Sequence, residues 1–276
     1  MKHLWRTLRT LLPWLVCGVL ASAVTLLTLA PVAWFSPEVA RATHGRARLI
    51  DGAGSLWRGS ATLALTPGAD PQGATVLPGR LEWHTAFWPL FAGRLLVHIR
   101  QTEAMPDAVV LDAGLRGGTV SAGNARLPAS LLAGLGAPFN TLDLQAEVHA
   151  TWSEWRWFGQ RVGAVAATPG GAAGGAYGRL DLDLRDAVSR VSTVRPLGSY
   201  HVAVQAEGAN ATLTLDTVKG PLLLDGHGDF GAAGVRFSGR ANAAPEQRDN
   251  LAGLLNLLGD PAGGGAVKLR FGSGML

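Results

Sequence analysis

The sequence predicts a mainly β protein: a single N-terminal transmembrane helix followed by an exported domain of antiparallel β-sheet with two short helices. Three observations support this fold class. Residues 11–35 contain no charged side chain, later segments alternate apolar with polar residues, and many of the 37 glycines fall between those segments. The chain therefore divides into a cytoplasmic tail (1–10), a transmembrane helix (11–35), a connector (36–45) and an exported β domain (46–276).

The uncharged stretch at residues 11–35 is long enough to cross a bilayer. About 20 apolar residues in a helix cover the roughly 30 Å hydrocarbon core. Lys2, Arg6 and Arg9 precede the stretch, and no acidic residue does. Because positive residues beside a first membrane segment favour the cytoplasmic side, we expect the tail to stay inside and the rest of the chain to be exported.

A cleaved signal peptide is the alternative, since Ala21-Ser22-Ala23 has the small-x-small pattern of a processing site. The apolar run continues well past that site, beyond the roughly 7 to 15 residues of an ordinary signal-peptide core. Trp14 and Trp34 lie near the two ends of the run, where indole rings favour the membrane interface. We therefore expect an uncleaved helix with Trp14 and Trp34 as membrane-anchoring residues.

The net charge of +4 is not evidence for a nucleic-acid partner. Three of the 24 basic residues belong to the tail and all 20 acidic residues follow it, which leaves the exported part at +1. The isoelectric point of about 9.8 therefore has little bearing on that part. Phosphate binding needs clustered Lys and Arg, and no such cluster occurs after residue 48. We expect membrane contact and no nucleic-acid binding.

The chemistry-bearing residues do not form a catalytic or cofactor-binding pattern. The one cysteine, Cys17, lies in the apolar stretch, so the exported part has no disulfide and no thiolate ligand. The seven histidines include no pair at metal-ligand spacing, and no Gly-x-Ser-x-Gly elbow or phosphate loop is present. We expect no enzymatic activity, no cofactor and no metal.

Period-two alternation predicts most of the exported part as strands. The clearest segment is Leu180-Asp181-Leu182-Asp183-Leu184, which places three leucines on one face of a sheet and two aspartates on the other. The predicted strands are residues 60–66, 94–101, 108–113, 141–152, 177–184, 200–207, 211–217, 221–225, 235–241 and 266–271.

Two exported segments favour a helix instead. One is residues 128–135. The other is residues 246–258, where four leucines (251, 254, 255 and 258) recur at the spacing of one helical face and Gly259 is the expected C-cap.

One short segment supports two interpretations. Residues 225–229 (Asp-Gly-His-Gly-Asp) place two carboxylates and an imidazole close enough to suggest a metal site. The two glycines favour a hairpin turn there instead.

The tryptophans offer the strongest candidates for contact residues. Alternation puts Trp155 and Trp157 on one face, as a groove wall or a contact for a partner. Trp57 stands between Gly54 and Gly59, where the first long strand pair should begin. As a buried plug it would stabilise the fold by roughly 3 to 5 kcal/mol relative to alanine, whereas as a docking residue it would leave stability unchanged.

Short motifs occur in a fixed order along the chain. Leu56-Trp57-Arg58-Gly59 has the form Leu-Trp-x-Gly, and a later segment has a Trp followed by Pro-x-Leu-x-x-Gly-x-Leu; the residues concerned are Leu56, Trp57, Gly59, Trp83, Pro89, Gly93 and Leu95. These motifs, the closing leucine helix and the last strand resemble, in the same order, those of the type II secretion system protein N family.

This resemblance implies an accessory component of the machinery that carries folded proteins across the outer membrane of Gram-negative bacteria. It places the chain in the inner membrane as a single-pass protein, with residues 46–276 in the periplasm and other secretion subunits as partners. It implies no catalytic residue. It also implies a curved antiparallel sheet with a long apolar groove, so the alternative function is lipid binding by that groove.

Overall fold

The protein is described from a computed structural model that covers residues 18, 31–32, 36–43, 45, 47–65, 75–129, 144–159, 175–231, 234–263 and 265–272. These residues form one antiparallel β-sheet with two short α-helices. The strands are β1 (Ala47–Gly54), β2 (Arg58–Leu65), β3 (Thr75–Val76), β4 (Leu81–Ala86), β5 (Arg94–Gln101), β6 (Met105–Gly114), β7 (Gly117–Val120), β8 (Gly123–Pro128), β9 (Leu144–Trp152), β10 (Trp155–Phe158), β11 (Gly175–Ser189), β12 (Gly198–Gly208), β13 (Asn210–Lys219), β14 (Leu222–Gly231), β15 (Gly234–Ala243), β16 (Asp260–Gly263) and β17 (Ala266–Gly272). The helices are α2 (Ser36–Ala42) and α4 (Arg248–Leu258), with 3-10 turns η2 (Trp88–Ala92) and η4 (Pro245–Gln247).

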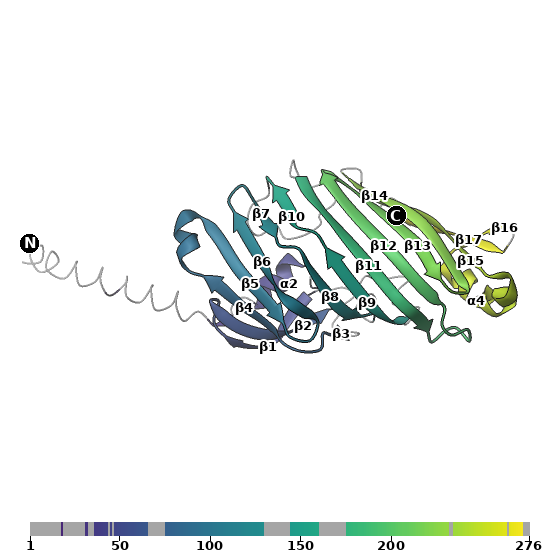
Figure 1. The fold of residues 1–276 in the computed structure, drawn as a ribbon, viewed down its shortest axis with the longest axis horizontal. Coiled ribbons are helices and arrows are strands. Elements are labelled where there is room, and N and C mark those ends of the chain that lie inside the picture. Colours follow the sequence, from purple (N-terminus) through teal and green to yellow (C-terminus); the bar gives the residue numbers. More distant parts are fainter. Residues whose placement is uncertain are drawn as a thin grey trace, which may run out of the picture.

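The sheet is a meander in which spatial order follows chain order. β2 pairs with β1 and β4, and each later strand pairs with its neighbours as far as β15, which pairs with β17. β9 and β10 are consecutive parts of one long strand, because β11 pairs with both. β7 and β8 form another, because β7 pairs with β10 and β8 pairs with β9. Figure 1 shows the strands side by side from the purple β1 end to the yellow β17 end.

The sheet is not flat. The central strands in Figure 1 are seen face-on, whereas β14, β15 and β17 are seen nearly edge-on. Irregular register is part of the reason. The register of β11 shifts between Leu184 and Ala187 against β12, and between Arg185 and Val188 against β9. Such bulges bend a strand and increase its twist. The curvature implied by the family resemblance is thus present.

The described residues of all ten predicted segments lie in strands except Pro221, and residues 66 and 141–143 lie outside the described residues. The segment predicted at residues 94–101 has the bounds of β5. Alternation missed β1, β3, β4, β7, β8, β10 and β16, most of which are short. β7 (Gly-Gly-Thr-Val) and β10 (Trp-Arg-Trp-Phe) contain too few residues for a period to be recognised. Their strand conformation depends on pairing with each other through four residue pairs.

One face of the sheet is apolar along its whole length. Register places Leu63, Trp83, Val97 and Leu111 on it in the first half, and Leu180, Leu182 and Leu184 in the second. The predicted opposition of those three leucines to the two aspartates is therefore confirmed. We call this side of the sheet the apolar face.

Helix α4 covers the C-terminal end of the apolar face. Its Leu251, Leu254 and Leu255 are buried in a core cluster with residues of β15 and β17. The predicted helix at 246–258 is confirmed, with its first residues in η4. Gly259 is the C-cap in extended backbone (φ 169°), and a Cβ there would collide with the Lys268 carbonyl oxygen.

Two other predicted segments are described only in part or in more detail. The predicted connector contains α2, which starts at Ser36 with Pro37 in its first turn, a position that suits proline. The predicted helix at 128–135 lies mostly outside the described residues, and Pro128 itself ends β8.

The turn expected at residues 225–229 was wrong. These residues lie inside β14 and pair with both β13 and β15. The glycines are needed for packing: a Cβ at Gly226 would lie 2.5 Å from the Phe237 ring. Among the described residues, no group of three or more His, Cys, Asp or Glu could hold a metal ion.

Within the part of the chain that the structure describes, no helix is long and apolar enough to span a membrane. Trp14, Trp34 and the tail 1–10 lie outside the described residues. The transmembrane helix at 11–35 therefore stays a prediction.

Candidate functional site

The family-like residues of the first third meet where the β1–β2 turn rests on β4. Leu56 and Trp57 lie in that turn, before β2 begins, so strand alternation does not apply to them. Thr85 of β4 donates two hydrogen bonds to the turn. Its Oγ1 donates to the Leu56 carbonyl (3.0 Å), and its backbone N–H donates to the Trp57 carbonyl (2.8 Å). We call residues 55–57 together with Trp83 and Thr85 the β1–β2 clasp.

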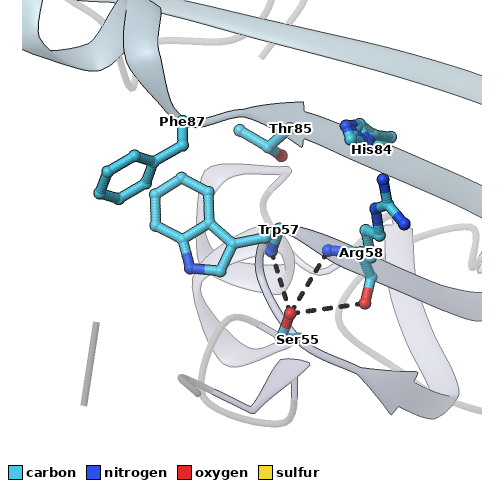
Figure 2. Close-up of a pocket in the computed structure, with 6 residues that line it drawn as sticks. All are labelled: Ser55, Trp57, Arg58, His84, Thr85 and Phe87. Atoms are coloured by element: carbon cyan, nitrogen blue, oxygen red, sulfur yellow. Dashed lines mark hydrogen bonds between the residues drawn. The ribbon is translucent and has the colours of Figure 1, made fainter. Parts of the chain in front are cut away.

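Ser55 closes the turn itself. Its Oγ accepts hydrogen bonds from the backbone N–H groups of Trp57 and Arg58, both at 3.3 Å, and its N–H donates to the Arg58 carbonyl at 2.8 Å (Figure 2). A serine that caps a turn in this way is held by the backbone. The hydroxyl is therefore a structural group.

Trp83 ties the clasp to the apolar face. Its indole lies over Gly59, directly opposite on β2, and its Nε1–H donates to the Ser55 carbonyl at 3.2 Å. A Cβ at Gly59 would collide with the indole ring. The glycine of the Leu-Trp-x-Gly motif thus leaves room for the tryptophan of the next motif.

Trp57 points toward the β4–β5 connection. Its ring meets Phe87 edge-on, with ring centroids 5.0 Å apart (Figure 2). Pro89 lies in the first turn of η2, and Gly93 ends η2 in a left-handed conformation (φ 69°) while its N–H donates to the Leu90 carbonyl at 2.9 Å. Pro89 and Gly93 therefore shape the connection that carries Phe87.

An open pocket lies beside the clasp, lined by Ser55, Trp57, Arg58, His84, Thr85 and Phe87. Its walls are mostly apolar and include the rings of Trp57 and Phe87, while the hydroxyls of Thr85 and Ser55 are hydrogen-bonded to backbone groups. Such a surface suits an apolar or aromatic contact. Ser55 and His84 both line the pocket, but among the described residues no hydrogen bond joins them as a nucleophile and its base would be joined.

Tryptophan over glycine recurs along the apolar face. Trp157 lies over Gly118, Trp152 over Gly123 and Trp155 over Gly178, each across a strand pair. Trp155 and Trp157 share one face, as predicted, and both are half-buried. Leu95, the last family-like residue, lies on the same face opposite Ala113.

The opposite face carries the charged residues. Arg179 binds Asp181 through two nitrogens, and this hydrogen bonding is the main reason why the pKa of Asp181 lies below its usual value. His201 Nδ1 is 2.8 Å from Asp183, which lies between His201 and His149 in the register. The Arg179–Asp181 pair lies within β11, whereas the contacts of His201 with Asp181 and Asp183 join β12 to β11.

The motifs include Leu56, Trp57, Gly59 and Trp83, which the structure brings together, but they did not identify Ser55, Thr85 and Phe87, which contact them. Ser and Thr in β segments carry no distinctive signal. Only the pairing of Arg58 with His84 brings Thr85 beneath the turn.

Comparison with known proteins supports the resemblance seen in the motifs. The model of the family described as type II secretion system (T2SS), protein N matches residues 47–270. Neither the curated proteins nor the solved structures gave a match. Because the family match runs from the first residue of β1 into β17, and so spans well over half of the chain, this protein belongs to the type II secretion system protein N family.

Proposed function

We propose that this protein is an accessory, non-enzymatic component of the type II secretion machinery that acts by binding other subunits. The observation that carries the proposal is the family match, which spans almost the whole sheet. Membership links the chain to type II secretion. The accessory role and the binding of other subunits are our inference.

We infer further that residues 11–35 anchor the protein in the inner membrane, with 1–10 in the cytoplasm, 36–45 as connector and 46–276 in the periplasm. The support is the uncharged stretch with basic residues on one side only. An export-dependent reporter fused after Leu276 should be active, and a cytoplasm-dependent one inactive. The opposite pattern would refute this topology.

Partner binding by strand addition is restricted at both ends of the sheet. At β1, Ser36 Oγ donates to the Leu49 carbonyl (2.7 Å), and Val32 packs on Gly52. At the other end, β16 contains Pro261, which offers no N–H, and its register is irregular. Strand edges protected in this way resist pairing with another chain. The faces and turns of the sheet are therefore the better candidates for contact with subunits.

Lipid binding is the second candidate, and the continuous apolar face favours it. Helix α4 covers only the end of that face, while Trp155, Leu180, Val204 and Leu213 stay half-buried in its middle. A row of half-exposed apolar side chains on a curved sheet could hold acyl chains.

One experiment separates the two candidates. A photo-reactive amino acid would replace Leu213, which lies on the apolar face opposite Val204, or its neighbour Thr214, which is exposed on the opposite face. Irradiation of intact cells carrying the full chain should give adducts at 213, with position 214 as the matched control. A lipid-sized adduct confined to 213 supports lipid handling.

A protein adduct that contains another secretion subunit supports subunit binding instead. Secretion should be followed in parallel in a strain that lacks the native gene. If secretion is normal without the protein and neither position forms an adduct with a secretion subunit, the proposed role in secretion fails.

A further inference from the structure

Four exposed apolar residues and the half-buried Trp57 of the clasp form one surface, which we call the aromatic rim: Trp57, Phe87, Trp88, Phe91 and Leu115. Trp88 is 80% exposed, Phe91 75% and Leu115 80%. Single exposed apolar side chains are ordinary on protein surfaces. A contiguous group of large ones marks a contact surface.

The rim is contiguous through ring contacts. Phe87 meets Trp57 at 5.0 Å and Phe91 at 5.3 Å between ring centroids, and Trp88 lies 6.0 Å from Phe91. A Cβ at Gly93 would lie 3.6 Å from Leu115, so the β6–β7 turn adjoins the same group. Three turns at one end of the strands, β1–β2, β4–β5 and β6–β7, therefore contribute to a single surface.

This surface lies beside the end of the uncharged N-terminal stretch. Pro31 forms a β-bridge with Ser55 in the β1–β2 turn, two residues from Trp57. Val32 is only 4% exposed, and a Cβ on Gly52 would lie 2.7 Å from its Cγ1. Pro31 and Val32, which belong to the stretch that we propose as membrane anchor, thus contact the β1–β2 turn and β1, beside the rim.

Charge at the rim also suits a membrane surface. Arg94 is neutralised by its ion pair with Asp112. Arg58 and Arg116, which flank the rim, form no ion pair among the described residues. Two available guanidinium groups beside aromatic side chains match the headgroup region of an anionic bilayer, where amphipathic rings and cations both bind favourably.

We propose that the aromatic rim lies in the headgroup region of the bilayer that holds residues 11–35. The sheet is then held at two points, by its anchor and by the rim, so its orientation to the membrane is restricted. This inference rests on the proposed anchor and goes beyond the proposed role in secretion. A rim that bound another protein would stay exposed in pure lipid vesicles.

The test uses the full chain with Cys17 replaced by alanine, which removes the only cysteine. A single cysteine is then placed at Phe91 and labelled with an environment-sensitive fluorophore. Val191→Cys is the matched control: Val191 is 48% exposed and lies in the β11–β12 turn, at the opposite end of the strands. Both proteins are reconstituted in vesicles of phosphatidylethanolamine and phosphatidylglycerol, and flotation verifies that they are anchored.

We expect the label at 91 to emit at shorter wavelength than at 191. It should be quenched several-fold more by lipids that carry a nitroxide near the headgroup, while aqueous iodide quenches only 191. Leu115→Cys should behave like Phe91→Cys, which guards against a local effect of either substitution. Equal iodide quenching at 91 and 191 in anchored protein would overturn the rim proposal and leave the anchor standing. Failure to float would overturn both.

Discussion

The indole of Trp83 covers Gly59 on the neighbouring strand so closely that a single methyl group on Gly59 would collide with it. The same Cβ would lie 2.8 Å from the Ser55 carbonyl oxygen. The clasp thus depends on the absence of a side chain at one position.

Gly59→Ala should destabilise the protein by about 1 to 3 kcal/mol, because overpacking forces the indole and the turn apart. Urea unfolding of the purified chain in mild detergent measures this change. Adding Trp83→Leu should recover part of the loss, since a smaller side chain vacates the space above residue 59. If Gly59→Ala alone has no effect, the close contact does not constrain the fold.

Gly253→Ala is the matched control and should act in the opposite direction. Gly253 lies in α4, and a Cβ there would meet nothing within 4 Å. Alanine in a helix is favoured over glycine by about 0.5 to 1 kcal/mol, so the same unfolding measurement should show a gain. A lower free energy of unfolding for Gly253→Ala would mean that other residues cover this side of α4.

Leu251→Ala should cost about 2 to 5 kcal/mol, because its fully buried side chain joins α4 to the sheet. Leu257→Ala, at a position 58% exposed in the same helix, should change stability by less than about 0.5 kcal/mol. Thermal melts of the two variants side by side measure the difference. Similar midpoints would show that α4 does not hold this end of the sheet.

Trp57→Ala should cost about 1 to 3 kcal/mol, less than the 3 to 5 kcal/mol expected of a fully buried plug. Trp57 is half-buried and packs edge-on against Phe87, and an aromatic pair adds about 0.5 to 1.5 kcal/mol to the area buried. Thermal melts with Trp88→Ala as an exposed control decide this. An unchanged midpoint for Trp57→Ala would favour a pure docking residue.

Tyr200 should make the protein sensitive to alkali. Burial raises the pKa of Tyr200 above its ordinary value of 10.0, and its hydroxyl donates to the Leu222 carbonyl at 3.1 Å. Above pH 10 the unfolded chain therefore loses this proton before the folded one, so stability is full below that pH and falls above it.

Tyr200→Phe removes both the hydrogen bond and this titration. Near pH 8 the variant should be less stable than wild type by about 1 kcal/mol. The difference should shrink above pH 10 by up to about 1.4 kcal/mol per pH unit. Urea unfolding of both proteins across this range measures it, and a difference that does not change with pH would contradict the assignment.

The sequence by itself determined the position of ten of the strands and which face of each is apolar. Residues 180–184 illustrate this, because side chains in a strand alternate whatever the partner strand is. It also determined the leucine stripe of α4 and, through short motifs near Trp57, Trp83 and Gly93, the family. These properties depend on residues that are close in the chain.

Only the tertiary structure decided which residues face one another across strands. That Gly59 lies beneath Trp83, and Gly226 against Phe237, depends on the register of each pair, which turns and bulges set and a period of two does not contain. The prediction of a turn at residues 225–229 failed because it considered only the local preference of glycine next to Asp. In the fold, these residues lie in β14, and the lack of a side chain at Gly226 makes room for the Phe237 ring of β15. The clasp and the aromatic rim likewise exist only because the meander brings three separate turns to one end of the sheet.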